Sequence, residues 1–227
     1  MEEKIRTNVT CISASNITHS GMVSSTSYRI CESVVSSIFN RGMTCESSII
    51  DLREYPVLPC IGCGECYDTH RCACDDAFNR IYERIIHSDV VFIVSPHYAP
   101  ILAQLCMILE KMEQITFLHW AKDNAYRSEL YGIPAGVIFH GGGAEWVLPS
   151  YKNMVNNPIA ITNALATIQL KLVPFSEEWK TGIPLPVRHV ENVSDSVFPV
   201  QEYDWNGDLD RRISDYVAVV MKSSPFG

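Results

Sequence analysis

Residues 89–100 read DVVFIVSPHYAP, and the first six of them form a nearly continuous apolar run. Such a run is typical of a strand that is buried on both faces, as the strands of a parallel sheet are. The residues that follow have helical periodicity. Their apolar members are Leu102, Leu105, Cys106, Leu109 and Met112. A buried strand followed by a helix is the unit from which parallel α/β sheets are built.

The same alternation extends in both directions along the chain. Further apolar segments predict strands at 8–13, 47–52, 133–139 and 168–173. Helical periodicity predicts helices from Ser24 to a C-cap at Gly42, from Asp76 to Ile86, at 158–167 and from Leu209 to Val220. Five strands alternating with helices predict a doubly wound parallel sheet. With the strand order 2-1-3-4-5, ligands bind at the carboxyl ends of the strands.

The length of 227 residues, of which 47% are hydrophobic, fits a single large α/β domain as well as two small ones. Because nothing marks a linker, we expect a single domain spanning residues 1–227. Two stretches lack a regular period. The first is the cysteine-rich segment after the second strand, residues 53–75, called the cysteine loop below. The second is residues 174–206, where Pro184, Pro186 and Pro199 predict an irregular excursion.

Composition narrows the range of partners and compartments. The formal net charge is −8 without a basic stripe, which argues against nucleic acid as a partner. No stretch of about 18 uninterrupted apolar residues exists to span a bilayer, so no membrane partner is expected. The first residues, MEEKIRTN, lack the apolar core of a signal peptide, which predicts a cytoplasmic protein. In that compartment nine cysteines favour metal or redox chemistry over a disulfide framework.

Five of those cysteines lie in the cysteine loop: Cys60, Cys63, Cys66, Cys72 and Cys74. Three thiolates at Cys-x2-Cys-x2-Cys spacing, with a fourth after five residues, are the soft ligands of a [4Fe–4S] cluster. Gly62 and Gly64 free the backbone to wrap a small object. Two alternatives stay open, a structural zinc ion and reduced thiols that line a pocket. Cys74 is then a spare or a competing ligand.

Four further cysteines have the apolar patterns of plain core residues: Cys11, Cys31, Cys45 and Cys106. Among the basic residues, Lys111, Lys122 and Arg127 are expected to be solvated.

Three loops that follow strands 1, 3 and 4 meet at one edge of the predicted sheet. The first offers hydroxyls that lead into a helix N-terminus, which favours an anion site. Its residues are Ser13, Ser15, Ser20, Ser24, Ser25 and Thr26. An ordinary serine-rich loop before a capped helix is the alternative.

The second of these loops adds an aromatic side chain, and the third adds glycines, which have no side chain. The second is Ser95-Pro96-His97-Tyr98, where a flat ring could stack. The third is His140-Gly141-Gly142-Gly143, whose glycines let a planar ligand come close. A phosphate pocket, a stacking turn and a wall without side chains together describe an FMN site.

The chain resembles the flavodoxin-like NADPH-dependent FMN reductase family and, within it, the iron–sulfur flavoproteins. The resemblance rests on Cys60-Ile-Gly-Cys63-Gly-Glu-Cys66 with Cys72, on Asp75-Asp76 opening a helix, and on residues 89–98. It implies that the Ser13–Thr26 loop holds the FMN phosphate and that the flavin ring lies against Ser95–Tyr98 and Gly141–Gly143. It also implies a [4Fe–4S] cluster on Cys60, Cys63, Cys66 and Cys72, and a homodimer or homotetramer.

The sequence departs from the family pattern in the phosphate loop. Family members commonly have Gly-Ser-Pro-Arg followed by Gly-Asn-Thr, where this chain has Ile12-Ser13-Ala14-Ser15 and Ser24-Ser25-Thr26. Hydroxyls and a helix N-terminus remain to bind a dianion.

The leading hypothesis is an electron-transfer iron–sulfur flavoprotein. Ferredoxin or NAD(P)H donates electrons, and FMN and the cluster pass them to a small-molecule acceptor. His97 and Tyr98 are weak candidates for catalytic groups. One alternative is a cluster-free NAD(P)H-dependent reductase of FMN, quinones or azo compounds. Others are a flavin-dependent oxidoreductase of one metabolite and a zinc-stabilised binding module.

Overall fold

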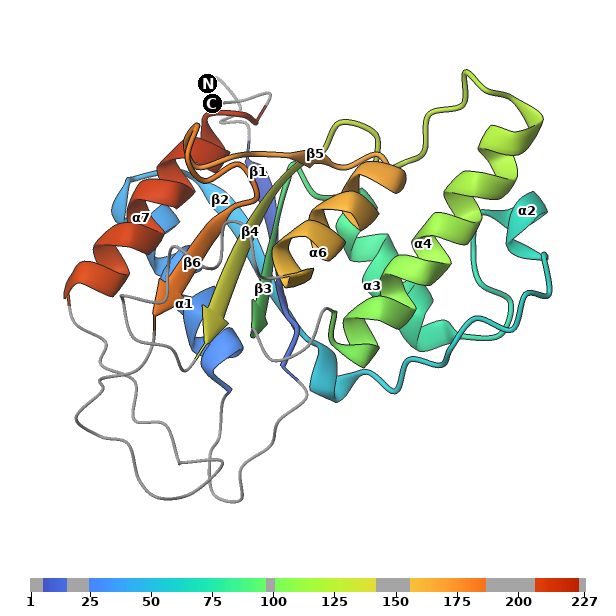
Figure 1. The fold of residues 1–227 in the computed structure, drawn as a ribbon, viewed down its shortest axis with the longest axis horizontal. Coiled ribbons are helices and arrows are strands. Elements are labelled where there is room, and N and C mark those ends of the chain that lie inside the picture. The colour runs from blue at the N-terminus through green and yellow to red at the C-terminus, as the bar shows by residue number, and fades with distance from the viewer. Residues whose placement is uncertain (1–5, 16–24, 97–100, 142–155, 187–206, 225–227) are drawn as a thin grey trace.

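The structure, a computed structural model, describes residues 6–15, 25–96, 101–141, 156–186 and 207–224. Six strands form one sheet in the order β2-β1-β3-β4-β5, with β6 pairing β4, and every pair is parallel (Figure 1). The predicted flavodoxin-like order is therefore confirmed. None of the helices within these ranges is both long and apolar enough to cross a bilayer.

The strands are β1 Thr7–Ser13, β2 Cys45–Asp51, β3 Val90–Pro96, β4 Pro134–Gly141, β5 Lys171–Leu172 and β6 Ile183–Pro186. The helices are α1 Thr26–Asn40, α2 Cys66–Thr69, α3 Asp76–Ile86, α4 Ala103–Lys122, α6 Asn156–Thr167 and α7 Gly207–Met221, and a short 3-10 helix, η1, spans Leu52–Glu54. Gly42 follows α1 with a positive φ of 71° and donates its N–H to the carbonyl of Phe39, as the predicted C-cap requires.

Helices cover both faces of the sheet, which explains the unbroken apolar run of β3. Figure 1 shows α1 and α7 on one face and α3, α4 and α6 on the other. Val90, Phe92 and Val94 belong to the core with α1 and α7, while Val91 and Ile93 belong to the core on the opposite face. Both faces of the strand are therefore buried. If apolar and polar residues alternated along β3, one of the two cores would receive polar side chains.

The core cysteines were predicted correctly in three of four cases. Cys11, Cys31 and Cys45 are buried, whereas Cys106 is exposed on α4. The prediction for Cys106 was wrong because it takes a position on α4 that faces away from the sheet, next to the buried Leu105.

The edge of the sheet beside β4 differs from the prediction. β5 is shorter than the expected 168–173 strand, and the stretch 174–206, predicted to be irregular, contains β6, which pairs with Ile138–Gly141. Pro184 and Pro186 hid this strand, although two prolines spaced by two residues leave their missing N–H groups on one side of an edge strand. Residues 187–206 lie outside the described ranges.

A glycine makes this second edge strand fit. Gly182 precedes β6 with φ +111°, and a Cβ at this position would lie 2.1 Å from the carbonyl oxygen of Val137. Only a residue without a side chain lets β6 lie against β4 here.

Candidate functional site

The carboxyl ends of β1, β3 and β4 lie side by side, as predicted from the strand order. Ser13 on β1 is in register with Val94 on β3, and Pro96 on β3 is in register with His140 on β4. The backbone amide of Ala14 donates to the carbonyl of Val94 at 2.9 Å and extends this contact beyond β1. Loops far apart in the sequence therefore leave the sheet from one edge.

Buried hydroxyls gather where β1 leads into α1. The Oγ atoms of Ser13 and Ser25 are 3.5 Å apart, and Ser25 is the N-cap of α1, accepting the amide of Tyr28 at 3.2 Å. Ser15 and Thr26 are buried beside them. The first amides of a helix have no partner within the helix, and its N-terminus carries partial positive charge. This set fits a phosphate group without a lysine. Ser20 and Ser24 lie outside the described residues.

His140, at the end of β4, joins this edge to α1. Its Nε2 lies 2.7 Å from Oγ of Ser27, and the ring is buried. Burial lowers the pKa of His140 from 6.5 to about 3, so the ring is neutral at neutral pH. The neutral ring of His140 therefore holds the end of β4 against α1 and adds no charge to this edge of the sheet.

Much of the predicted flavin wall lies outside the described ranges. Ser95 and Pro96 are buried at the end of β3, and Gly141 ends β4. His97, Tyr98, Gly142 and Gly143 belong to segments that the structure does not describe. Their proposed contacts with the flavin ring, and a catalytic role for His97 or Tyr98, stay predictions.

The cysteine loop forms a pocket of about 420 Å³ against α3 and α4. All five of its cysteines line this pocket: Cys60, Cys63, Cys66, Cys72 and Cys74. Apolar side chains make up most of the remaining wall, among them Leu58, Phe78, Ile115 and Leu118. Burial raises the pKa of the Cys66 thiol, and the nearby thiols of Cys60, Cys63 and Cys72 raise it further. The four predicted ligands therefore surround one space.

The backbone of this loop turns where the sequence has glycines. Gly62 and Gly64 have φ values of 67° and 78°, in the left-handed region that glycine favours. The amide of Gly62 donates to Sγ of Cys60 at 3.5 Å. Across the described ranges, no three His, Cys, Asp or Glu side chains converge on a single ion position. This geometry therefore supports neither the zinc alternative nor the predicted [4Fe–4S] cluster.

A buried ion pair anchors the pocket to the two helices. The Asp75 carboxylate caps α3 by accepting the amide of Phe78 at 2.9 Å, accepts the amide of Leu58 at 2.8 Å, and pairs with Nζ of Lys111 on α4. Side-chain exposure is only 4% for Lys111 and 2% for Asp75.

Burial alone would raise the pKa of Asp75, but the hydrogen bonds from Lys111, Phe78 and Leu58 outweigh it and lower this pKa. The prediction of a solvated Lys111 was wrong. Its spacing to Ile108 and Ile115 on the buried face of α4 is the signal that sequence reasoning missed.

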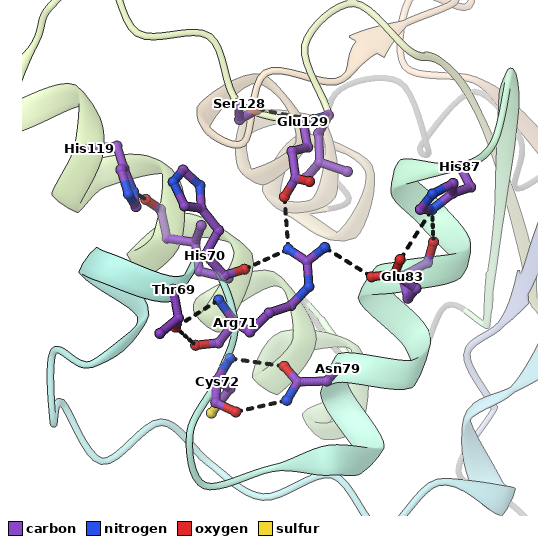
Figure 2. A network of polar contacts seen from close by, with 12 residues as sticks. Thr69, His70, Arg71, Cys72, Asn79, Glu83, His87, His119, Ser128 and Glu129 are labelled. Atoms are coloured by element: carbon purple, nitrogen blue, oxygen red, sulfur yellow. Dashed lines mark hydrogen bonds and ion pairs between the residues drawn. The ribbon is translucent and has the colours of Figure 1, made fainter.

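A second network holds Arg71 and Cys72 of the loop (Figure 2). The Arg71 guanidinium donates to Glu83 on α3 at 2.9 Å and to Glu129 at 2.8 Å. Asn79 on α3 accepts the amide of Cys72 at 2.9 Å and donates to its carbonyl at 2.8 Å. The backbone of Cys72 is thereby fixed to α3. The cysteine spacing did not predict these roles of Arg71 and Asn79.

Stacked rings fix α2 to α4. His70 and His119 stack with their ring centroids 3.9 Å apart, and the Tyr126 hydroxyl lies 3.2 Å from Nδ1 of His70. Tyr67 also stacks on His119, with the ring centroids 5.5 Å apart. Burial, and then the neighbouring His119, lower the pKa of His70. Contacts with α3, α4 and the segment after α4 therefore hold the cysteine loop between Tyr67 and Asp75, and Asp75 also holds Leu58.

The geometry at the sheet edge agrees with the result of a comparison with protein families. The model of the NADPH-dependent FMN reductase family matches residues 7–157. The chain belongs to this family. Membership supports FMN as the cofactor and FMN-dependent oxidoreduction as the class of activity. The match spans β1 to the start of α6 and so contains both the sheet edge and the cysteine loop. A search of the curated proteins gives no match.

Solved structures share the fold. An oxidoreductase from Corynebacterium diphtheriae aligns with a TM-score of 0.55 and 15% identity, over 96% of this chain and 98% of that one. A flavoenzyme NAD(P)H:(acceptor) oxidoreductase from Paracoccus denitrificans has a TM-score of 0.55 and 14% identity, over 97% and 100%. An NADH:FMN oxidoreductase in its apo form has a TM-score of 0.54 and 11% identity, over 96% and 90%. At these identities the similarity establishes the fold alone, and none of these names mentions an iron–sulfur centre.

Proposed function

We propose that the protein is an NAD(P)H-dependent FMN oxidoreductase that passes electrons to a small-molecule acceptor. The family match over residues 7–157 carries this proposal, and the hydroxyl cluster at the end of β1 supports it. NAD(P)H is the donor that the family description favours, while quinones, azo compounds, free flavin or one dedicated metabolite are the candidate acceptors. We further propose a cytoplasmic homodimer or homotetramer.

The residues of the sheet edge have separate tasks in this proposal. Ser13, Ser25 and the N-terminal amides of α1 bind the FMN phosphate, because hydroxyls and helix amides donate to a dianion. His140 stays neutral and fixes the end of β4 to Ser27, so the wall of the site adds no titrating charge near neutral pH. When bound, FMN supplies the capacity to accept a hydride and to release electrons singly or in pairs.

Flavin binding and donor oxidation test this proposal directly. The purified chain should release FMN in a ratio near one per chain when heated, and NADH or NADPH should bleach the flavin absorbance in a stopped-flow experiment. Riboflavin, which lacks the phosphate, should bind more weakly than FMN. A chain that binds neither flavin, or binds FMN that no nicotinamide reduces, would contradict the proposal.

The cysteine pocket favours a second candidate function, an iron–sulfur flavoprotein that takes electrons from ferredoxin. The supporting observation is that Cys60, Cys63, Cys66 and Cys72 line one pocket. The thiols of Cys60, Cys63 and Cys72 also raise the pKa of the Cys66 thiol. A four-iron cluster is larger than a single ion, so its thiolates need not converge on one point. These four residues would hold the cluster, and soft thiolates suit it.

Iron content separates the two candidates. The chain should be purified without oxygen, and iron, sulfide and flavin should be assayed on one sample. The iron–sulfur candidate predicts about four irons per chain, and Cys72→Ser should lose most of them while the exposed Cys106→Ser keeps them. Flavin without iron in the wild-type chain would leave the cluster-free reductase as the function.

A further inference from the structure

A buried ion pair lies at the carboxyl end of β2, next to the hydroxyls at the end of β1. Asp51 is in register with Ser13 on the neighbouring strand, and paired strands lie about 4.8 Å apart. Cys11 and Ile49, two residues earlier on each strand, pack in the core that α1 shares with the sheet. Because side chains alternate along a strand, Ser13 and Asp51 also face α1.

Arg53, in η1, is held against Asp51 in a fixed direction. The Asp51 carboxylate accepts the backbone amide of Arg53 at 3.2 Å and its Nε at 3.0 Å, and it also pairs with Nη2. Side-chain exposure is 2% for Asp51 and 15% for Arg53. Within the described ranges, Nη1 of Arg53 has no hydrogen-bond partner. Its two N–H groups are therefore available to an acceptor at this corner.

The first turn of α1 lies beside this pair. Burial raises the pKa of Tyr28 in that turn, and acidic neighbours that include Asp51 raise it further. Tyr28 donates its amide to Ser25, whose Oγ lies 3.5 Å from that of Ser13. The Asp51–Arg53 pair and the hydroxyl cluster therefore occupy one corner of the sheet edge, formed by β1, β2 and α1.

We propose that Arg53 donates through Nη1 to the phosphate of FMN and that Asp51 is the positioning residue that directs it, a role that rests on the proposed FMN-dependent function. The hydroxyls of Ser13 and Ser25 are uncharged and His140 is neutral, so the hydroxyl cluster brings no positive side chain to a dianion. A guanidinium has five N–H donors in a rigid fork that matches phosphate oxygens. Asp51 holds one edge of the fork and leaves the other edge free.

A second role for Arg53 has to be separated from this one. Asp51 carries a negative charge close to the phosphate corner, so Arg53 could favour FMN simply by neutralising Asp51. Removing both charges distinguishes the two roles. If Arg53 only neutralises, a chain without either charge binds FMN as well as the wild type does. If Arg53 donates to the phosphate, that chain loses affinity for FMN.

The test compares FMN with riboflavin, which lacks the phosphate, on the full-length chain from which flavin has been removed. Quenching of flavin fluorescence gives the Kd of each. Asp51→Asn combined with Arg53→Gln leaves no charge buried alone, so its fold should be retained. Its Kd for FMN should rise about 10- to 100-fold, as expected for one lost hydrogen bond to a charged group. Its Kd for riboflavin should stay within about twofold of the wild type.

A matched pair of substitutions controls for the loss of charge. Arg6→Gln combined with Glu46→Gln removes the exposed ion pair, 3.3 Å long, at the opposite end of β1 and β2. This chain should bind both flavins as the wild type does. An unchanged Kd for FMN in the Asp51→Asn and Arg53→Gln double variant would overturn the proposal, and so would equal weakening of both flavins.

Arg53→Lys keeps a cation beside Asp51 and serves if the double variant does not fold. Lysine presents a single nitrogen, so this variant should also bind FMN more weakly and riboflavin normally. In that case an unchanged Kd for FMN would overturn the proposal. The wild-type chain separates this result from failure of the proposed function. If it binds no flavin, the function fails as well, whereas a preference for FMN that survives loss of Arg53 removes only the role of Arg53.

Discussion

The edge of the sheet and the cysteine pocket are built in opposite ways. At the edge, residues from three strands that are far apart in the sequence meet because the strands are in register, as Ser13, Pro96 and His140 do. In the pocket, the thiols come from one short stretch between Cys60 and Cys74, and distant elements supply only the supports. The edge gathers hydroxyls and a neutral imidazole, whereas the pocket gathers thiols, and Lys111 of the buried ion pair lines it with them.

The difference shows where each region should be sensitive. The geometry of the edge depends on the sheet, which is fixed by two hydrophobic cores and many ladder hydrogen bonds. The geometry of the pocket depends on a few side chains that anchor a loop, chiefly Lys111, Asp75, Arg71 and Asn79. Substituting one anchoring side chain should therefore change the geometry of the pocket. Substituting one side chain at the edge should change the groups available for binding and leave the geometry of the sheet intact.

The largest effect is expected from the buried ion pair of the pocket. Lys111→Met leaves the Asp75 carboxylate buried without its cation, and the free energy of unfolding should fall by about 3–5 kcal/mol. Urea unfolding followed by fluorescence measures this change. Lys122→Met, at an exposed lysine on the same helix whose Nζ lies 4.9 Å from the Tyr67 ring centroid, should cost no more than about 1 kcal/mol.

A double variant sharpens this test. Asp75→Asn combined with Lys111→Met removes both charges and should recover part of the loss, because no charge is then buried alone. If Lys111→Met cost no more than Lys122→Met, the pair would not anchor the pocket.

The second effect concerns the edge and depends on pH. The pKa of His140 is about 3 in the folded chain and 6.5 ordinarily. Between these values the unfolded chain binds a proton that the folded chain does not. The stability that depends on neutral His140 is therefore fully present above pH 6.5. As the pH falls toward 3, the free energy of unfolding decreases by up to about 1.4 kcal/mol per pH unit.

His140→Gln should flatten this part of the profile, measured as the urea midpoint at several pH values. His87→Gln, at an exposed histidine after α3, should keep the wild-type slope. An unchanged slope in His140→Gln would show that another group causes the acid sensitivity.

The third effect tests the chemistry of the edge. Ser25→Ala removes the N-cap of α1 and should cost about 1 kcal/mol of stability. It should also weaken FMN binding more than riboflavin binding, since only FMN carries the phosphate, as fluorescence quenching of each flavin can measure. Ser36→Ala, at an exposed position on the same helix, is the matched control. Equal weakening for both flavins would argue against a phosphate contact at Ser25.

The smallest effect belongs to the partly exposed anchor of the pocket. Arg71→Gln breaks the ion pairs to Glu83 and Glu129, which should cost about 0.2–1 kcal/mol because solvent screens them. Hydrogen exchange of the Cys66–Cys72 amides should speed up while exchange in β3 stays unchanged. Arg84→Gln, at an exposed arginine of α3, should change neither. Slow exchange in the Arg71 variant would show that Asn79 and the ring stack suffice to hold the loop.

Much of the fold was predictable because its signals are local. The apolar run at 89–94 predicts a strand buried on both faces, and the alternation of strands with helices predicts a doubly wound parallel sheet, as the structure has it. β6 was missed because Pro184 and Pro186 break the local pattern of a strand, and only pairing with β4 makes them acceptable. The spacing of the cysteines places five thiols in one short segment, and all five line one pocket.

The sequence by itself determined the chemical groups available, namely hydroxyls before α1 and five thiols within one loop. Tertiary structure decided which of those groups meet and what holds them. Lys111 was expected to be solvated, and packing buried it against Asp75, because burial depends on which helix covers a face. His140 owes its neutral state to the elements packed around it. The spacing of Lys111 within its helix indicates a buried face, but its partner Asp75 is set by how α3 and α4 pack together.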